Sequence, residues 1–468
     1  MTRAADPSDL SQLSSTVQQT LALHGLHGQL HGGLGSVPAG QRVQAVLAED
    51  GVGLLQVLFA QDSLLDLTRL NELTGRKLTA VPPPALRQLL ARHRLQRLPA
   101  LPLPGVPCLY DAALAHHEQL WLDPGLPGVA LQVNADSFRR LLDQAIGGPF
   151  TVPLASLRPN LDRPDEDTAQ ISQAVEAFTA RRIRQRLEEA LEIPPLPHTA
   201  NRIVKLRVDP NASIDDVTDV VETDPALAAQ VISWASSPYY GSLAKIRSVE
   251  DAIIRVLGFD LVINLALGLA LGKTLSLPKD EPQQATPYWQ QAIYTATVVD
   301  GLLRTMPRER RPEAGLAYLG GLLHNFGYLV LAQVFPPHFS LFCRHRDLNP
   351  HVHHSQIEQH LLGITREQIG AWTMHAWGMP DELYTALRFQ NDPDYQGDHA
   401  ACANLVCLAV RMLAARGIGN DPRQDIPASL FERLSIDPEK AEAAVEKVLG
   451  AEAALRNLAG QMQAPGLR

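Results

Sequence analysis

Alternating hydrophobic and polar positions dominate residues 1–148 of the chain. The alternation is clear at residues 43–47, 55–59 and 129–133, and a period of two is typical of half-buried strands. Between the first strands and the last, residues 63–75 carry leucines at helical spacing. This mixture predicts an α/β domain, a mixed sheet with helices, over the first 148 residues.

Two helix boundaries can be read from this first region. Ser63 and Asp66 lie three positions apart at the start of the leucine pattern, as in a capping box. Gly75 follows the pattern, and glycine readily adopts the left-handed conformation that ends many helices. We therefore expect a short helix between these two points.

Residues 149–170 break both patterns. This stretch is rich in proline and polar residues and has no clear period. Because proline removes a backbone donor and blocks helix continuation, we expect a linker between domains here.

From residue 171 onward the pattern is almost wholly helical. Asp224 followed by Pro225 places a cap before a proline at the first helical position, and Ser248 with Asp251 resembles a capping box, with Gly258 as the stop. We predict an all-α domain over residues 171–415, followed by a helical extension over residues 416–468. The expected fold class is an α/β domain followed by an all-α domain.

Composition and charge narrow the class of protein. The chain has 468 residues, 45% of them hydrophobic, and a net charge of −9 at pH 7. It can therefore bury a core in each domain. Its net negative charge provides no overall positive potential that would attract nucleic acid. The first residues lack the features of a signal peptide, and the most apolar stretch, residues 261–277, is short for a membrane span. We expect a cytoplasmic protein with a buried core helix in that stretch and no membrane partner.

The helical region carries motifs in a recognisable order, which are IPPLPHTANRIVKL, DDVTDVVETDPALAAQVISWASSPYYG, IRSVEDAIIRVLGFDLVINLALG, GGLLHNFGYLVLA and GAWTMHAWGMPDELYTAL. These segments resemble the HDOD domain, an all-helical relative of the HD metal-dependent phosphohydrolases that is typical of bacterial signalling proteins. By this resemblance, the metal-binding HD pair corresponds to His324 and Asn325. Asn325 offers a neutral amide oxygen where a metal site needs an anionic carboxylate.

Other positions where an active relative carries metal ligands are also changed, and they read Trp289-Gln290-Gln291, Arg366 and Phe389-Gln390. An arginine in such a pocket would repel a cation. We therefore expect a vestigial HD-type pocket with no catalytic metal and no cofactor. His324 is interpreted as a buried, hydrogen-bonded histidine in preference to a retained binding residue.

A histidine-rich stretch occupies residues 345–360, with the sequence HRDLNPHVHHSQIEQH. Such density is compatible with metal binding. Asn349-Pro350 indicates a loop, and the spacing gives no defined pair of a histidine with a carboxylate beyond Glu358. We therefore favour a solvated loop leading into a helix. Adventitious metal binding is the alternative.

The first domain resembles a YbaK/ProX-type aminoacyl-tRNA deacylase domain through VQAVLAED, GLLQVLFAQDSLLDLTRLNELTGRKLTAV, PGVPCLYDAAL and PGVALQVNADSFRRLL. Where active relatives place a lysine on the first strand, this chain has Gln44. The glycine-rich loop of those relatives is replaced by ARHRLQRLPALPLPG, so a developing oxyanion has no evident stabiliser. Deacylation is therefore not expected.

A local basic cluster consists of Arg87, Arg92, Arg94 and Arg97. Arginine binds phosphate in a bidentate manner, so this cluster is a candidate phosphate or RNA contact. A solvated helix face is the simpler interpretation, and we expect at most weak tRNA binding.

These features favour a non-catalytic regulatory protein in which both domains act as binding modules, with protein partners in a signalling pathway. The alternative is an enzyme, either a metal-dependent HD-type phosphohydrolase or an aminoacyl-tRNA deacylase. The number of metal ligands separates the two hypotheses and favours the binding protein.

Overall fold

The computed structural model describes residues 12–26, 29–32, 37–183, 196–240, 246–272 and 274–463. Their contacts divide the chain into two units. The first consists of Met1–Arg158, Glu281–Gln284 and Ser340–His360, and the second contains the remaining residues. The chain first passes from one unit to the other between Arg158 and Pro159, within the stretch expected to be a linker.

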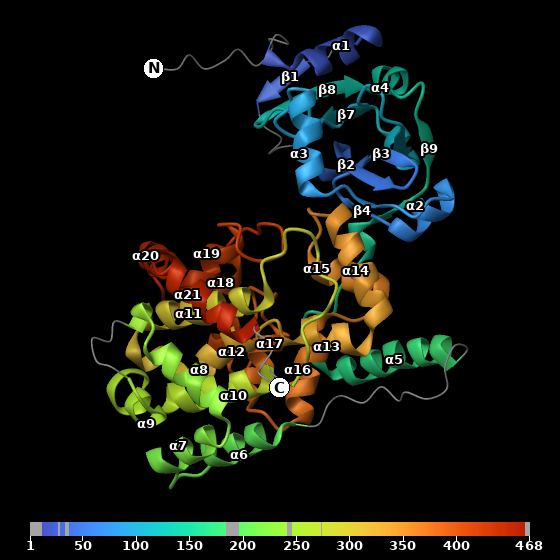
Figure 1. Cartoon of the computed structure of the whole chain (residues 1–468). Helices are drawn as coiled ribbons and strands as arrows, with labels where there is room; N and C mark the ends of the chain where they lie inside the picture. The colour runs from blue at the N-terminus through green and yellow to red at the C-terminus, as the bar shows by residue number, and fades with distance from the viewer. Residues whose placement is uncertain are drawn as a thin grey trace, which may run out of the picture. The chain divides into compact units, whose positions relative to one another are not determined.

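The first unit is built on a mixed sheet (Figure 1). Its strands are β1 (Gln29–Gly32), β2 (Arg42–Asp50), β3 (Gly53–Ala60), β4 (Ser63–Leu65), β5 (Thr79–Ala80), β6 (Cys108–Asp111), β7 (Gln119–Leu122), β8 (Val129–Asn134), β9 (Ile146–Gly148) and β10 (Thr151–Pro153). The main sheet has the order β1-β8-β7-β2-β3-β6-β9, with β5 paired to β2, while β10 pairs separately with β4. The helices are α1 (Ser15–Leu23), α2 (Leu67–Thr74), α3 (Pro83–Arg92) and α4 (Ala135–Leu141).

Strands β2 and β3 form the antiparallel hairpin at the centre of this sheet. Its turn is held by Asp50, whose carboxylate accepts hydrogen bonds from the amides of Val52 and Gly53 at 2.9 and 3.3 Å. Leu58 packs in one hydrophobic cluster, while Val57 and Phe59 belong to another. Successive side chains of β3 therefore face opposite sides of the sheet, as the alternating sequence predicted. The expectation of a half-buried strand is wrong, because residues 55–60 of β3 are buried on both faces.

Residues 340–360 complete the second of these clusters from far along the chain. They span most of α14 (Pro336–Leu348) and α15 (His354–Leu362). Leu348 is fully buried in the same cluster as Phe59 and Leu67. This segment lies inside the range 171–415 predicted as the helical domain, yet it packs with the first unit.

The second unit is helical (Figure 1). Apart from α14 and α15, its α-helices are α5 (Asp167–Ile183), α6 (His198–Arg207), α7 (Ile214–Glu222), α8 (Pro225–Ala235), α9 (Val249–Ala252), α10 (Phe259–Gly272), α11 (Tyr288–Thr305), α12 (Ala314–Leu323), α13 (Phe326–Val334), α16 (Arg366–Ala376), α17 (Asp381–Arg388), α18 (Ala400–Ala414), α19 (Ala428–Leu434), α20 (Pro438–Gly450) and α21 (Glu452–Gln463). The predicted fold class, an α/β domain followed by an all-α domain, is confirmed.

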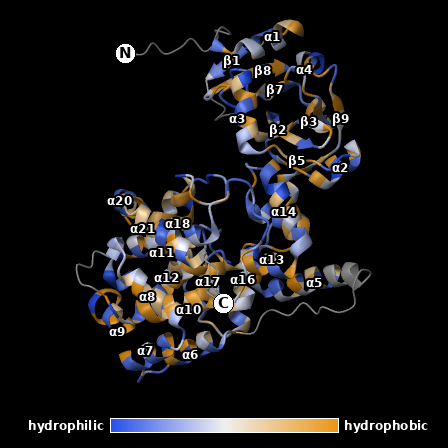
Figure 2. Ribbon diagram, in the orientation of Figure 1, coloured by the Kyte–Doolittle hydropathy of each residue, from blue (hydrophilic) through white to orange (hydrophobic). Residues whose placement is uncertain are grey.

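Helices α10, α11 and α12 form the core of this unit. Every residue of α10 from Val262 to Gly272 is buried, which confirms the buried core helix expected in the most apolar stretch. Figure 2 shows the hydrophobic colouring of α10 and α12. Among the described residues, one helical segment, Ala314–Val334, is long and apolar enough to cross a membrane, but 94% of its apolar window is buried inside the structure. It is therefore part of the core.

Candidate functional site

His324 and Asn325, the residues expected at the position of the HD pair, lie in the turn between α12 and α13. The His324 side chain is buried, and its Nδ1 lies 2.8 Å from the carbonyl oxygen of Gly321. Its own carbonyl accepts a hydrogen bond of 2.6 Å from the side-chain amide of Gln390. The HD position is thus tied into the core by hydrogen bonds to the backbone.

Arg366 occupies the space beside Asn325. It begins α16, is 4% exposed, and its Nη1 donates to Asn325 Oδ1 at 3.1 Å. The guanidinium also lies over the ring of Tyr328, 5.0 Å from the ring centre. A fixed positive charge therefore binds the one oxygen of the HD pair's second side chain, where a catalytic metal would require an anionic ligand.

Phe389 and Gln390 also serve the packing of the second unit. Phe389 is buried and stacks on Tyr395, with ring centres 3.9 Å apart. The Gln390 amide donates to the carbonyl oxygens of His324 and Leu387. Neither side chain offers an imidazole or a carboxylate to a metal.

Gln44, which stands where active deacylase relatives place a lysine, contacts His351 of the histidine-rich segment, residues 345–360. Gln44, on β2, places its amide nitrogen 2.8 Å from Nε2 and 3.1 Å from Nδ1 of His351, and Nε2 of His351 lies 3.0 Å from the carbonyl oxygen of Ser63. Because only an unprotonated ring nitrogen can accept from the Gln44 amide, these contacts need the neutral imidazole. Because burial lowers the pKa of His351 to about 4, this neutral form predominates at neutral pH.

The predicted loop leading into a helix is present, since residues 349–353 precede α15, but the expectation that this stretch is solvated is wrong. His345 is fully buried within α14, its Nδ1 is 3.0 Å from the carbonyl oxygen of Leu341, and its Nε2 accepts from the amide of Leu67 at 3.1 Å. Asn349 both donates to and accepts from the backbone of Leu65. The sequence pattern missed this because the polar groups are satisfied by a part of the chain almost 300 positions away.

Asp66, His345 and His360 form a cluster of ligand-type atoms, all within 4.8 Å of one another. Asp66 caps α2 by accepting from the amides of Thr68 and Arg69, and His360 Nε2 lies 3.2 Å from its Oδ2. Burial alone would raise the pKa of Asp66, but the neighbouring imidazoles of His345 and His360 and the hydrogen bond from the Arg69 amide hold it well below its usual range. The Asp66 carboxylate lies at the N-terminus of α2, and its Oδ2 is 3.3 Å from Nε of Arg69. Both the helix dipole and the guanidinium are positive at this point and disfavour a bound cation.

The four arginines of the proposed phosphate patch, Arg87, Arg92, Arg94 and Arg97, are all exposed. Arg87 and Arg92 lie on α3, and Arg94 follows with a left-handed φ of 52°. Arg97 forms an ion pair of 3.0 Å with Asp123. These positions are accessible, and their role stays a prediction.

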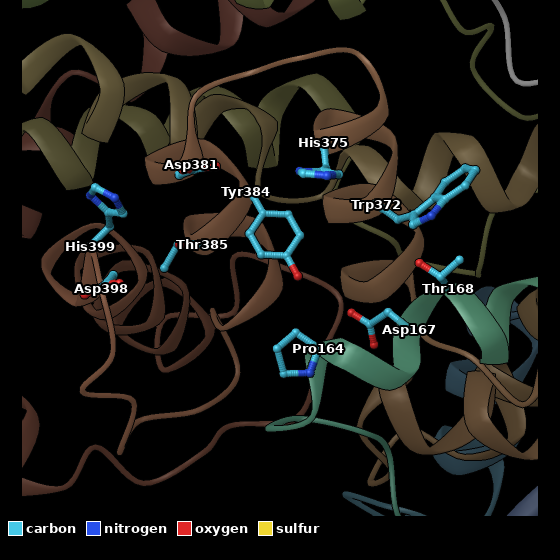
Figure 3. Close-up of a pocket in the computed structure, with 10 residues that line it drawn as sticks. All are labelled: Pro164, Asp167, Thr168, Trp372, His375, Asp381, Tyr384, Thr385, Asp398 and His399. Atoms are coloured by element: carbon cyan, nitrogen blue, oxygen red, sulfur yellow. The ribbon is translucent and has the colours of Figure 1, made fainter.

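A cavity of about 420 Å³ lies in the second unit (Figure 3). Helix α16 contributes Trp372 and His375, and α17 contributes Asp381, Tyr384 and Thr385. In Figure 3 the Tyr384 ring stands near the centre, with its hydroxyl directed toward Asp167 and Pro164. The size is that of a small-molecule site.

The start of α5 supplies Asp167 and Thr168 to the remaining wall, and Pro164 lies in the turn just before this helix. The segment before α18 supplies Asp398 and His399. His399 has a left-handed φ of 54°, a conformation uncommon for a residue with a side chain. None of these residues was singled out from the sequence, because they converge only when α5, α16 and α17 pack together.

Comparison with known proteins gives the family. An HDOD domain model matches residues 193–393, of which residues 193–195 lie outside the described residues, and an aminoacyl-tRNA editing domain model matches residues 27–141. The crystal structure of a candidate signal transduction protein from Marinobacter aquaeolei VT8 is 42% identical, has a TM-score of 0.88, and covers 96% of this chain and 100% of that one. The chain belongs to the HDOD-domain family. This HDOD protein also carries the expected editing-type domain at its N-terminal end.

Two further relatives are more distant. An HDOD protein of unknown function from Geobacter sulfurreducens is 21% identical, with a TM-score of 0.50, over 61% of this chain and 97% of that one, a likeness of fold. An uncharacterised protein from Treponema pallidum (strain Nichols) is 25% identical over 258 residues. That match covers 53% of this chain and 47% of the relative, so this chain spans about half the length of the Treponema protein.

Proposed function

We propose that this HDOD protein is a non-catalytic signalling or regulatory protein whose two domains bind partners. The observation that carries the proposal is the contact of Arg366 with Asn325 at 3.1 Å. A buried guanidinium opposes a divalent cation by charge, and a hydrolytic site needs several anionic or imidazole ligands around that cation.

The first domain supports the same conclusion. A deacylase needs a cationic or amide-rich site for the developing oxyanion. Here Gln44 contacts a neutral His351, so this position supplies neither a free cation nor an open space. We infer a binding role for the editing-type domain as well.

We further propose a cytoplasmic location and protein partners in a signalling pathway. The similarity to the Marinobacter protein, which is named for signal transduction, supports this. The composition, with a net charge of −9, argues against strong tRNA binding.

The test uses the full chain purified without a metal-affinity tag. Metal content is determined by elemental analysis, phosphodiesterase activity is assayed with added manganese, and deacylation is assayed with a panel of mischarged tRNAs. We expect substoichiometric metal and no turnover above the uncatalysed rate. Near-stoichiometric metal with metal-dependent hydrolysis would establish the phosphohydrolase instead, and robust deacylation would establish the editing enzyme.

A further inference from the structure

The cavity between α5, α16 and α17 has a chemical character that points to one class of ligand. Its wall combines two aromatic side chains, Trp372 and Tyr384, with the carboxylates of Asp167, Asp381 and Asp398. Among the residues that the structure describes, no lysine or arginine lines it. It is also separate from the HD pair, since neither His324 nor Asn325 belongs to its wall.

The charge of this wall is negative. Asp167 is neutralised by Arg388, whose Nε and Nη2 lie 2.5 and 3.0 Å from its two carboxylate oxygens. Asp381 and Asp398 are exposed, and within the described parts of the chain neither carboxylate forms an ion pair or a side-chain hydrogen bond. The cavity therefore presents two carboxylates that have no basic partner among the described residues.

The aromatic groups add a surface suited to a flat cation. Trp372 and Tyr384 are half-buried, and both residues line the cavity. Burial, followed by the neighbouring Asp167 carboxylate, raises the pKa of Tyr384, which keeps its phenol neutral at neutral pH. The faces of Trp and Tyr attract cations through their quadrupole.

We propose that this cavity binds a guanidinium group carried on an aliphatic chain. The carboxylates of Asp381 and Asp398 supply the charge, and the rings of Trp372 and Tyr384 supply a stacking surface. A guanidinium fits better than an ammonium because it is planar, weakly hydrated and able to stack while it donates hydrogen bonds in its plane. The group can belong to a free small molecule or to an arginine side chain of a protein. This inference goes beyond the proposed function, because such a site would exist whether or not the domain hydrolyses anything.

Calorimetric titration of the full chain tests the proposal with two charged probes and their neutral counterparts. Butylguanidine represents the free source and is compared with butylurea, in which a neutral urea replaces the guanidinium. Acetyl-Gly-Arg-Gly-amide represents the protein source and is compared with its citrulline analogue. We expect at least one charged probe to bind with a dissociation constant of about 1 mM or lower, and its neutral counterpart to bind at least about tenfold more weakly.

Three variants assign the binding to this cavity. Asp381→Asn and Asp398→Asn should each weaken the charged probe about three- to tenfold, and Trp372→Leu should weaken it by a similar factor. Asp219→Asn, an exposed carboxylate on α7 away from the cavity wall, should leave the affinity unchanged. Circular dichroism of each variant checks that the fold is retained.

Binding of butylguanidine alone would assign the site to a small molecule, and binding of the arginine peptide would assign it to a protein side chain. Either result supports the proposal. Absence of binding by both probes, equal binding of the neutral counterparts, or full affinity in both Asp→Asn variants would overturn it. Hydrolysis is measured separately, so failure here leaves the test of the proposed function unaffected.

Discussion

Arg388 and Asp167 lie 221 positions apart in the chain, yet they form a bidentate ion pair with contacts of 2.5 and 3.0 Å. Both side chains are almost completely buried. The Gln368 amide donates to Oδ1 of Asp167 at 2.8 Å, so both carboxylate oxygens accept hydrogen bonds. The pair holds the first residue of α5 against the end of α17, and with it one wall of the cavity.

We predict that Arg388→Leu destabilises the second unit by about 3–5 kcal/mol, because it leaves the Asp167 carboxylate buried without its partner. Chemical denaturation followed by circular dichroism, together with the midpoint of thermal unfolding, measures the loss. The matched control is Arg163→Leu in the exposed Arg163–Glu166 pair, which should change stability by less than about 1 kcal/mol. Equal effects of the two substitutions would contradict the assigned role.

Asn325→Asp restores the carboxylate of an HD pair, but we predict that it restores no hydrolysis. The new carboxylate would lie beside Arg366 and form an ion pair with it, since the Asn325 oxygen is already 3.1 Å from that guanidinium. Phosphodiesterase activity with added manganese should stay at background, and the metal content should not rise. Asn211→Asp, in an exposed turn, serves as the control for the added charge. Metal-dependent turnover in Asn325→Asp would show that one ligand suffices.

The contribution of His351 to the stability of the first unit should be lost as the pH drops from about 6.5 to about 4. The pKa of His351 is lowered to about 4 in the folded chain because the ring is buried. The unfolded state, with an ordinary histidine pKa of about 6.5, therefore binds more protons in this window, and acidification favours unfolding. Above this window the contribution of His351 is fully present.

His351→Gln isolates this contribution. Unfolding midpoints of the variant should depend less on pH between about 6.5 and 4 than those of the parent chain. Groups such as Asp347, whose pKa is raised by burial to about 6, titrate in the same window but are common to both proteins and cancel in the difference. His116→Asn, at an exposed position, should retain the parental pH dependence. An unchanged slope in His351→Gln would refute the assignment.

The arginine cluster should contribute little to nucleic-acid binding. We expect weak tRNA association whose dependence on salt is unchanged when Arg87, Arg92 and Arg94 are replaced by glutamine. Each phosphate contact that is lost lowers the slope of log K against log salt by about 0.7 to 0.9, so filter binding over a salt series detects even one contact. A drop of that size in the triple variant would instead assign a phosphate-binding role to this surface.

Local signals in the sequence located much of the fold. The alternating stretches at residues 43–47 and 55–59 are the central hairpin, and Gly75 ends α2 in the left-handed conformation, with φ of 64°. One capping detail was wrong. Asp66 is the cap of α2, while Ser63 lies in β4, because β4 pairs with β10 and delays the start of the helix.

The candidate sites were less accessible to sequence analysis. The expectation of a lost HD ligand at Asn325 rests on a substitution at a known motif and stays a prediction. The position of Arg366 against it, and of His351 against Gln44, depends on packing between distant segments. No local pattern encodes such contacts, and the cavity around Tyr384 is hidden from sequence analysis for the same reason.

The placement of residues 340–360 in the first unit has a consequence for synthesis of the chain. Residues 1–158 leave the ribosome first, but the hydrophobic cluster that holds Phe59 also needs Leu348. At roughly 5–20 residues per second, translation from residue 158 to residue 360 takes about 10–40 s. During that interval the nascent sheet exposes the apolar face that α14 later covers, so the growing chain is a natural client for chaperones that shield unfinished domains.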